Sequence, residues 1–373
     1  TRRRAVLALW LRRLQVRLRG VEFRERDTSQ MPPKDLWRID ICWSATLGLS
    51  MVDSVTAAAF QARHLLLALR AGEPYRISRA LALEAVHVAI AGGRAGHRAE
   101  RYLEQAMALA RRVDDPHALG VVSMASGIVA WLKGRWARAV ELADEAETTF
   151  RESCTGVAWE LEAARACAFW ALCACGAVDE LSHRLPLALP DGEDGRDSPV
   201  ADRTTDMVTL PRLAANDPDG AERDLGEETA ECWEDRFHVK RFHRLLAHVQ
   251  IDLYRGDGRR ARDRITDVWR SLNGSYLLRV QLLRVMVFDA LGRAALSEAD
   301  GADDSQPLLR AAEQHARRLR REKEPWVEPL AETILAAVAA SRGQRSKATT
   351  LLRDAISRFD ALNMSLRASC ARR

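Results

Sequence analysis

No stretch of the sequence is apolar for long enough to cross a lipid bilayer. Hydrophobic residues make up 47% of the 373 residues. They are interleaved with polar ones, so that no run approaches the roughly eighteen apolar residues that a spanning helix needs. A secretory signal is not expected either, because arginines interrupt the first hydrophobic stretch. We therefore predict a cytoplasmic protein that has no membrane partner.

The sequence also lacks the short motifs of the common nucleotide-dependent and hydrolytic enzymes. It contains no G-x-G-x-x-G, no phosphate loop ending in G-K-[ST] and no G-x-S-x-G. The H-R-D and D-F-G motifs of protein kinases are missing as well. We therefore predict that this chain is not itself an enzyme, has no catalytic residues and binds no cofactor.

Neither the histidines nor the cysteines follow a metal-ligand pattern. His238, His243 and His248 are five residues apart, and five residues turn a helix by about 140°, so their side chains cannot share a face. Cys173 and Cys175 lack the two-residue gap of zinc and redox pairs. The seven cysteines are odd in number and lie mostly in apolar segments, which predicts reduced thiols and no metal site.

Acidic residues are absent from the first nineteen positions, which contain seven arginines. Because the whole chain has a net charge of +5, the rest has a net charge of −2 and no general attraction for nucleic acid. Residues 3–19 predict a basic amphipathic helix. It could anchor the chain to a membrane surface or target it, but we favour a repeat helix whose arginines cover apolar surface.

The most informative stretch runs from Gly120 to Arg151 and predicts two helices joined by a tight turn at Gly134. Glycine adopts the left-handed conformation that ends a helix without steric cost. The second helix places apolar and small residues on one face at three- and four-residue steps: Trp136, Ala139, Val140, Ala143, Ala146 and Phe150. A hairpin of this kind needs neighbours on both sides to bury enough surface.

Similar pieces recur along the chain. Residues 254–261 and 341–348 align with 132–139, and turn glycines recur at Gly134, Gly176, Gly256 and Gly343. The separations of these glycines indicate units of somewhat more than forty residues, or shorter units with insertions. We therefore predict an all-α fold of antiparallel helical hairpins stacked in a tetratricopeptide-like right-handed α-solenoid.

The segments of the chain follow from its glycines, prolines and charged loops. Residues 1–33 predict a basic helix and a connector that ends in a double proline. Residues 34–189 and 200–373 predict N-terminal and C-terminal helical repeats, separated by a loop at 190–199. The individual helices are expected at 34–50, 54–71, 75–92, 97–113, 157–175, 177–187, 200–215, 218–234, 236–255, 258–273, 276–298, 305–323, 326–342 and 345–362. Pro116 is expected in the first turn of the helix that enters the 120–151 hairpin. Residues 366–373 are expected to be frayed.

The hairpin at 120–151 resembles the tetratricopeptide repeat. Gly134 matches the turn glycine of the motif, and Gly127, Trp136, Ala139 and Ala146 match its small and aromatic positions. Ser123, Ser126 and Arg151 depart from the motif. The resemblance implies a partner-binding groove lined by first helices, here Val121, Met124, Ile128 and Trp131. The same side chains could instead pack against the adjacent unit.

Most of the chain is similar to the C-terminal helical-repeat region of large bacterial serine/threonine protein kinases, in which a kinase domain and an NTPase module precede the repeats. The similar stretches are FRERD (23–27), RIDICWSATLGLSMVD (38–53), residues 60–85, CTGVAWELEAARA (154–166), IDLYRGDG (251–258) and LLRVQLLRV (277–285).

This resemblance implies a non-catalytic regulatory or sensory scaffold that takes part in signal transduction. It would bind a protein or peptide, a small ligand, or the attached kinase and NTPase domains. Two alternatives remain open at the level of sequence. The chain could be a self-standing helical enzyme with an unrecognised pocket, or a nucleic-acid-binding regulator with a basic stripe.

Overall fold

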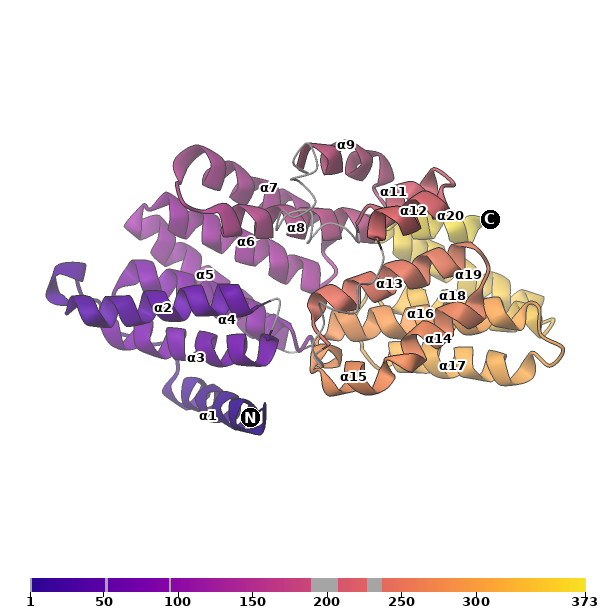
Figure 1. Ribbon diagram of the computed structural model, residues 1–373, viewed down its shortest axis with the longest axis horizontal. Helices are drawn as coiled ribbons and strands as arrows, with labels where there is room; N and C mark the ends of the chain where they lie inside the picture. The colour runs from indigo at the N-terminus through magenta and orange to yellow at the C-terminus, as the bar shows by residue number, and fades with distance from the viewer. Residues whose placement is uncertain (1, 51–52, 94, 189–206, 227–236) are drawn as a thin grey trace. The chain divides into compact units, whose positions relative to one another are not determined.

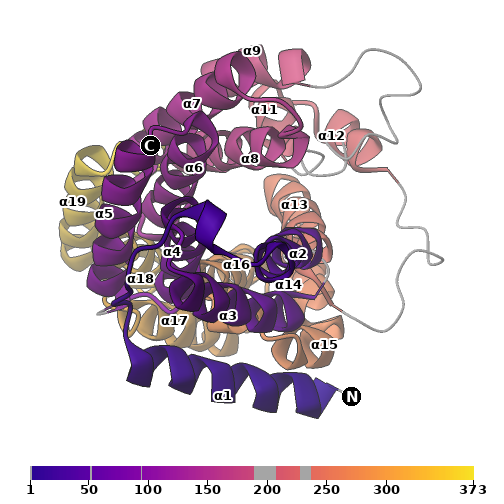
Figure 2. The same ribbon diagram turned by 90° about the vertical axis from the view of Figure 1, so that its left-hand side faces the viewer.

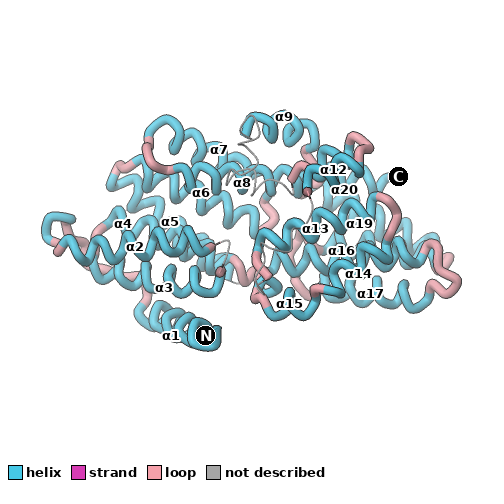
Figure 3. The backbone as a smooth tube through the Cα atoms, viewed as in Figure 1, coloured by secondary structure: helices cyan, strands magenta, loops and turns pink. Residues whose placement is uncertain are grey.

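The computed structural model describes residues 2–50, 53–93, 95–188, 207–226 and 237–373. In these ranges the chain forms helices joined by short turns and contains no β-strand (Figures 1 and 3). The predicted all-α fold class is therefore confirmed. No helix in the described ranges combines the length and the apolar character that a transmembrane segment requires.

The order of the helices follows the predicted one closely. The first part of the chain contains α1 (Arg2–Arg19), α2 (Pro33–Leu49), α3 (Ser54–Ala71), α4 (Pro74–Ala89), α5 (Ala95–Val113), α6 (Pro116–Leu132), α7 (Trp136–Ser153), α8 (Ala158–Cys175) and α9 (Val178–Ala188). The second part contains α11 (Thr209–Ala214), α12 (Pro218–Leu225), α13 (Val239–Tyr254), α14 (Gly258–Asp267), α15 (Trp269–Gly274), α16 (Gln281–Ala299), α17 (Gln306–Arg320), α18 (Glu328–Ser341), α19 (Arg345–Ala361) and α20 (Ser365–Arg372). Thr28–Gln30 and Leu277–Arg279 form single 3₁₀ turns.

Acidic residues and prolines set the starts of several helices. Glu73 accepts two backbone N–H groups in the first turn of α4, each at 3.0 Å, and Pro74 is the first residue of that helix. Asp115 accepts the N–H of Ala118 at 2.9 Å, and Pro116 is the first residue of α6, as predicted. These side chains satisfy N–H groups that have no partner within the helix, and proline has no such group to leave unsatisfied.

All four predicted turn glycines adopt a left-handed conformation. The φ angles of Gly134, Gly176, Gly256 and Gly343 lie between +73° and +78°. Each of these glycines follows a helix directly or within two residues and allows the chain to return as the next helix. The predicted positions of the hairpin turns are therefore confirmed.

The contacts of the chain divide it into two compact units. Unit 1 comprises residues 1–130 and 141–165, and unit 2 comprises residues 131–140 and 166–373. The division passes through α6, α7 and α8. The loop predicted at 190–199 as the boundary between two repeat regions lies outside the described residues.

Unit 1 consists of hairpins whose helices pack in sequence order. α2 packs against α3, α3 against α4 and α4 against α5, while α1 lies along α3 (Figures 1 and 2). One hydrophobic core runs through the unit and includes Ile39, Leu65, Ile77, Leu81, Met124 and Phe150. Gly120 on α6 lies against the Phe150 ring of α7, so the absence of a Cβ atom allows these two helices to approach closely.

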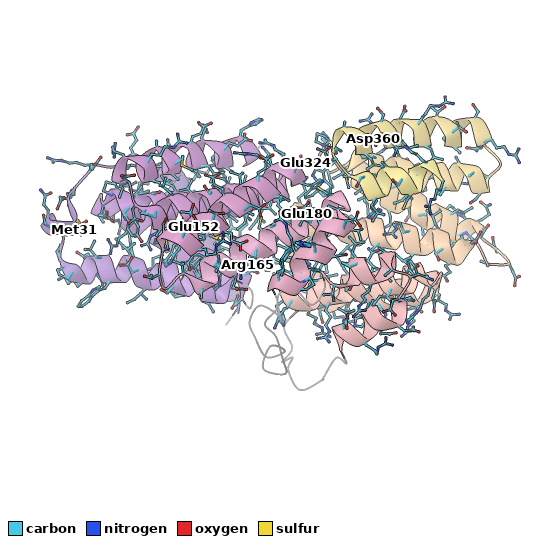
Figure 4. The ribbon with its side chains drawn as sticks, turned by 90° about the horizontal axis from the view of Figure 1, so that it is seen from above. Met31, Glu152, Arg165, Glu180, Glu324 and Asp360 are labelled. Atoms are coloured by element: carbon cyan, nitrogen blue, oxygen red, sulfur yellow. The ribbon has the colours of Figure 1, made fainter. Side chains whose placement is uncertain are left out.

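Polar contacts add to the pairing of the later helices of unit 1. Ser123 on α6 donates to Glu145 on α7 at 3.2 Å. Arg165 on α8, labelled in Figure 4, donates to Glu147 on α7 at 2.9 Å. The helices of this unit therefore contact their sequence neighbours through both apolar and polar side chains.

Unit 2 repeats the same arrangement. α13 packs against α14, α16 against α17 and α18 against α19, and contacts between α14 and α16 and between α17 and α18 join one pair to the next. One of its hydrophobic cores includes Phe242, Ile265, Val287 and Ala290, and smaller cores lie elsewhere in the unit.

Some helix ends in unit 2 differ from the prediction. The helix predicted at 218–234 ends at Leu225, because Gly226 has a φ of +67°; residues 227–234 of this prediction lie outside the described residues. The helix predicted at 258–273 is interrupted at Val268, and the one predicted at 276–298 starts only at Gln281, because Tyr276 has a φ of +71°. Of the helix predicted at 200–215, residues 200–206 lie outside the described residues.

The prediction of a frayed C-terminus is wrong. Residues 365–372 form α20, in which Ala368 is fully buried. The Ser365 hydroxyl donates to the carbonyl of Cys175 at 3.2 Å. A contact with a residue 190 positions away holds this helix in place, which no local signal in the sequence could show.

Candidate functional site

Two arginines of α4 converge on one carboxylate of α2. Arg76 donates to both oxygens of Asp40, from Nε at 3.1 Å and from Nη2 at 2.7 Å. Arg79 donates from Nη2 to the same carboxylate at 2.8 Å. Arg76 also donates to Glu73 at 3.1 Å. Paired, charge-assisted bonds of this kind fix both distance and orientation, so they hold α2 and α4 in one register.

Further contacts connect α4 to α6 and α8, the first helices of the next two hairpins. The Tyr75 hydroxyl of α4 lies 2.9 Å from Nδ1 of His117 on α6. Nε2 of His117 lies 3.4 Å from Glu160 on α8. We call Asp40, Tyr75, Arg76, Arg79, His117 and Glu160 the polar ladder. Its members come from α2, α4, α6 and α8, the helix that begins each hairpin of unit 1.

Arg79 occupies the most enclosed position in the polar ladder. Its guanidinium lies between two aromatic rings, 4.7 Å from the centroid of Trp43 and 4.3 Å from that of Tyr75. Only 6% of its side chain is exposed. Cation–π attraction and the bond to Asp40 offset the cost of burying this charge.

A buried histidine lies beside this group. His64 on α3 is fully buried, with its ring centroid 5.8 Å from that of Trp43. Burial lowers the pKa of His64 to about 3, and the nearby Arg79 and Arg76 act in the same direction. Nδ1 of His64 lies 3.2 Å from the side-chain oxygen of Gln61, whose amide nitrogen donates to the carbonyl of Ala80 at 2.8 Å. His64 is therefore a neutral core residue near neutral pH.

Two large apolar side chains are exposed next to the polar ladder. Trp37 and Ile41 lie one turn apart on α2 and are 65% and 63% exposed. The buried residues of this helix, Ile39 and Cys42 among them, fall on its opposite side. We call Trp37 and Ile41, with Asp40 at their edge, the α2 surface. Among the described residues it combines exposed aromatic area with positioned charges, as protein-binding surfaces do.

The four groove residues predicted from the sequence are buried or half-buried. Val121 and Met124 are fully buried in the core of unit 1, and Ile128 packs against that core. Trp131 belongs to unit 2, where it stacks on Trp170 with ring centroids 5.1 Å apart. The buried members of this set therefore contribute to packing, which was the alternative considered for them.

The aromatic stack in unit 2 includes one of the three histidines that were considered as metal ligands. Trp170 lies between Trp131 and His243, and its ring is nearly parallel to that of His243 at a centroid distance of 5.1 Å. His238 instead caps the start of α13. The described residues contain no group of three or more His, Cys, Asp or Glu side chains that could hold a metal ion.

The polar ladder was not predicted, although the sequence contains a signal for it. Pro74-Tyr75 and Pro116-His117 are 42 residues apart and place a hydrogen-bonding ring at the second position of successive first helices. A search for polar residues at the repeat spacing would have found this pair. The exposure of Trp37 has no comparable signal, because tryptophan is common in both cores and interfaces.

Comparison of the sequence with protein-family models and with curated proteins finds no match. The resemblance to the repeat region of bacterial kinases therefore stays a prediction.

Proposed function

We propose that this chain is a tetratricopeptide-like right-handed α-solenoid that acts as a non-catalytic binding scaffold in a signalling protein. The polar ladder is the observation that supports this best. Its contacts join residues 36, 39, 42 and 43 positions apart. Contacts that recur at intervals of about forty residues between equivalent helices are typical of solenoids, in which each unit contacts only its neighbours.

Unit 2 has polar contacts at the same spacing. Gln281 donates to the carbonyl of Glu322, 41 positions away, at 2.9 Å. Arg293 donates to Gln250 across 43 positions at 3.1 Å. Ser297 donates to the carbonyl of Gly256 across 41 positions at 3.1 Å. A common repeat length in both units supports one repeating architecture rather than two unrelated helical folds.

The α2 surface is the proposed site of partner binding. Trp37 and Ile41 provide the apolar centre that protein interfaces require, and Asp40 provides a polar edge. Because Asp40 also binds Arg76 and Arg79, a partner that draws Asp40 away would release two arginines of the next hairpin. Occupancy of this surface would thus alter the contacts between neighbouring hairpins.

We further propose that the scaffold regulates a bacterial serine/threonine kinase domain that belongs to the same polypeptide. The six similar stretches between residues 23 and 285 support this assignment. The first experiment is to sequence the reading frame upstream of the codon for Thr1. A kinase domain in that frame is expected, whereas a start codon directly at this position would overturn the kinase assignment.

The second experiment measures binding of that separately expressed kinase domain to the 373-residue chain by biolayer interferometry. The double variant Trp37→Ser/Ile41→Ser is expected to weaken binding at least tenfold, since apolar anchors dominate interface affinity. The matched control is Leu187→Ser, which changes a leucine that is 76% exposed on another helix. Unchanged binding by the double variant would overturn the assignment of the α2 surface.

A further inference from the structure

The first helix of the chain exposes a row of leucines. Leu7, Leu11, Leu14 and Leu18 are between 52% and 79% exposed, and Trp10 beside them is 61% exposed. The leucines follow one another at steps of four, three and four residues. We call these four residues the leucine seam.

The leucine seam is not the side of α1 that packs on unit 1. Val16 is buried in the core of that unit, and Arg13 pairs with the buried carboxylate of Glu84. Arg19 donates to the carbonyl of Leu69 on α3 at 3.2 Å. Figure 2 shows α1 alongside α3, with its other side facing away from the unit. The helix is therefore apolar on two sides, and contacts within unit 1 cover only one of them.

The spacing of the leucine seam indicates what covers the second side. Steps of four, three and four residues place the leucines at the first and fourth positions of a heptad, within a stripe about 60° wide at about 100° per residue. Trp10 extends this exposed apolar surface on one edge. Leucines at these two heptad positions are the pattern with which two helices pack side by side.

The positive charge of α1 favours one kind of helical partner over another. The first nineteen residues hold seven arginines and no acid. Arg17 is exposed and, like Trp10, lies in the heptad position just before a leucine of the seam. Pairing with a second copy of α1 would bring two strongly basic helices together, which like-charge repulsion disfavours. Glutamates beside the apolar row of a different helix would instead attract these arginines.

We propose that the leucine seam binds an acidic amphipathic helix of a partner protein. The partner helix would carry leucine or isoleucine at the first and fourth heptad positions, with glutamate or aspartate at the flanking positions. This surface lies on α1, apart from the α2 surface, and the inference does not depend on the proposed kinase partner.

The test uses two fluorescent three-heptad peptides as probes and the full 373-residue chain. Both peptides have leucine at the first and fourth heptad positions; one has glutamate at the flanking positions and the other has lysine. Fluorescence anisotropy is expected to show binding of the acidic peptide and at least tenfold weaker binding of the basic one. Added salt should weaken the acidic complex, because the flanking ion pairs are solvent-exposed.

Substitutions in α1 test whether the acidic peptide binds to the leucine seam. Leu11→Gln/Leu14→Gln should weaken binding of the acidic peptide at least tenfold, and Leu187→Gln, which replaces an exposed leucine of α9, should leave it unchanged. Arg17→Glu should weaken the acidic complex and strengthen the basic one. Circular dichroism of each variant should match that of the unmodified chain, because the substituted side chains are exposed.

Any other outcome would overturn the proposal. One such outcome is no binding of the acidic peptide at about 100 µM, which corresponds to negligible affinity for a helical interface. Another is equal binding of both peptides. Binding that survives the double substitution would place the peptide elsewhere. Sedimentation with phosphatidylglycerol vesicles that depends on Leu11 and Leu14 would identify a lipid surface as the occupant, and self-association that depends on them would identify a second copy.

Discussion

The indole of Trp326 lies against the α-carbon of Gly134, in the position that a Cβ atom would occupy. Gly134 also has a φ of +73°, which disfavours any residue with a side chain. The substitution Gly134→Ala is therefore expected to lower the free energy of unfolding by about 2–4 kcal/mol, from backbone strain and overpacking together. Urea denaturation followed by circular dichroism measures this loss.

Gly343 is the matched control for this prediction. Its φ is +74°, but a Cβ atom added there would meet no neighbouring atom within 4 Å. Gly343→Ala should therefore cost only the backbone term of about 1–2 kcal/mol. In a Trp326→Ala background, the excess loss at Gly134 should disappear. Equal losses at the two glycines would contradict a packing role for Trp326.

The polar ladder predicts that Asp40 stabilises unit 1. Asp40→Ala would leave Arg76 and Arg79 without their shared acceptor while both remain largely buried. A loss of about 1–2 kcal/mol in the free energy of unfolding is expected, a value reduced from that of a buried pair because 38% of the Asp40 side chain is exposed. Thermal or urea denaturation would measure it.

Asp35 on the same helix provides the comparison. It pairs with Arg38 at 3.7 Å, and both side chains are exposed. Asp35→Ala should change the stability by less than about 0.5 kcal/mol, as is usual for surface ion pairs. If Asp35→Ala and Asp40→Ala behave alike, then the polar ladder does not hold α2 and α4 together.

Substitution of Met124 tests whether this predicted groove residue packs in the core or binds a partner. Its side chain is 1% exposed within the core of unit 1, so Met124→Ala should cost about 2–4 kcal/mol through lost contacts and a cavity. Ile41→Ala, at an exposed position of the α2 surface, should cost less than about 0.5 kcal/mol. A stable Met124→Ala variant with impaired partner binding would restore the groove predicted from the sequence.

Local features of the fold could be predicted from the sequence, and contacts between distant residues could not. Gly134 and Pro116 fix backbone conformation by themselves, so the turn and the helix start were predicted correctly. Val121 and Met124 were harder to place, because a helix inside a stack is apolar on more than one side and the pattern does not show which side is open. The polar ladder depends on which helices become neighbours, and α20 depends on a carbonyl 190 positions away.

Acid should destabilise the chain through its buried histidines. Burial lowers the pKa of His64 from 6.5 to about 3, so the unfolded chain takes up a proton that the folded chain excludes. The contribution of neutral His64 to the free energy of unfolding is complete above pH 6.5. It is lost as the pH falls from there toward 3, by up to about 1.4 kcal/mol per pH unit.

Urea denaturation between pH 7 and about 5, above the range where most carboxylates titrate, should show this decline in the free energy of unfolding. His64→Asn should reduce the slope whatever its effect on stability at pH 7, because His87 and His315, whose pKa values burial also lowers to about 4, remain. His97→Asn, at an exposed position, should leave the slope unchanged. An identical slope in the His64 variant would show that this histidine is not excluded from protonation in the folded state.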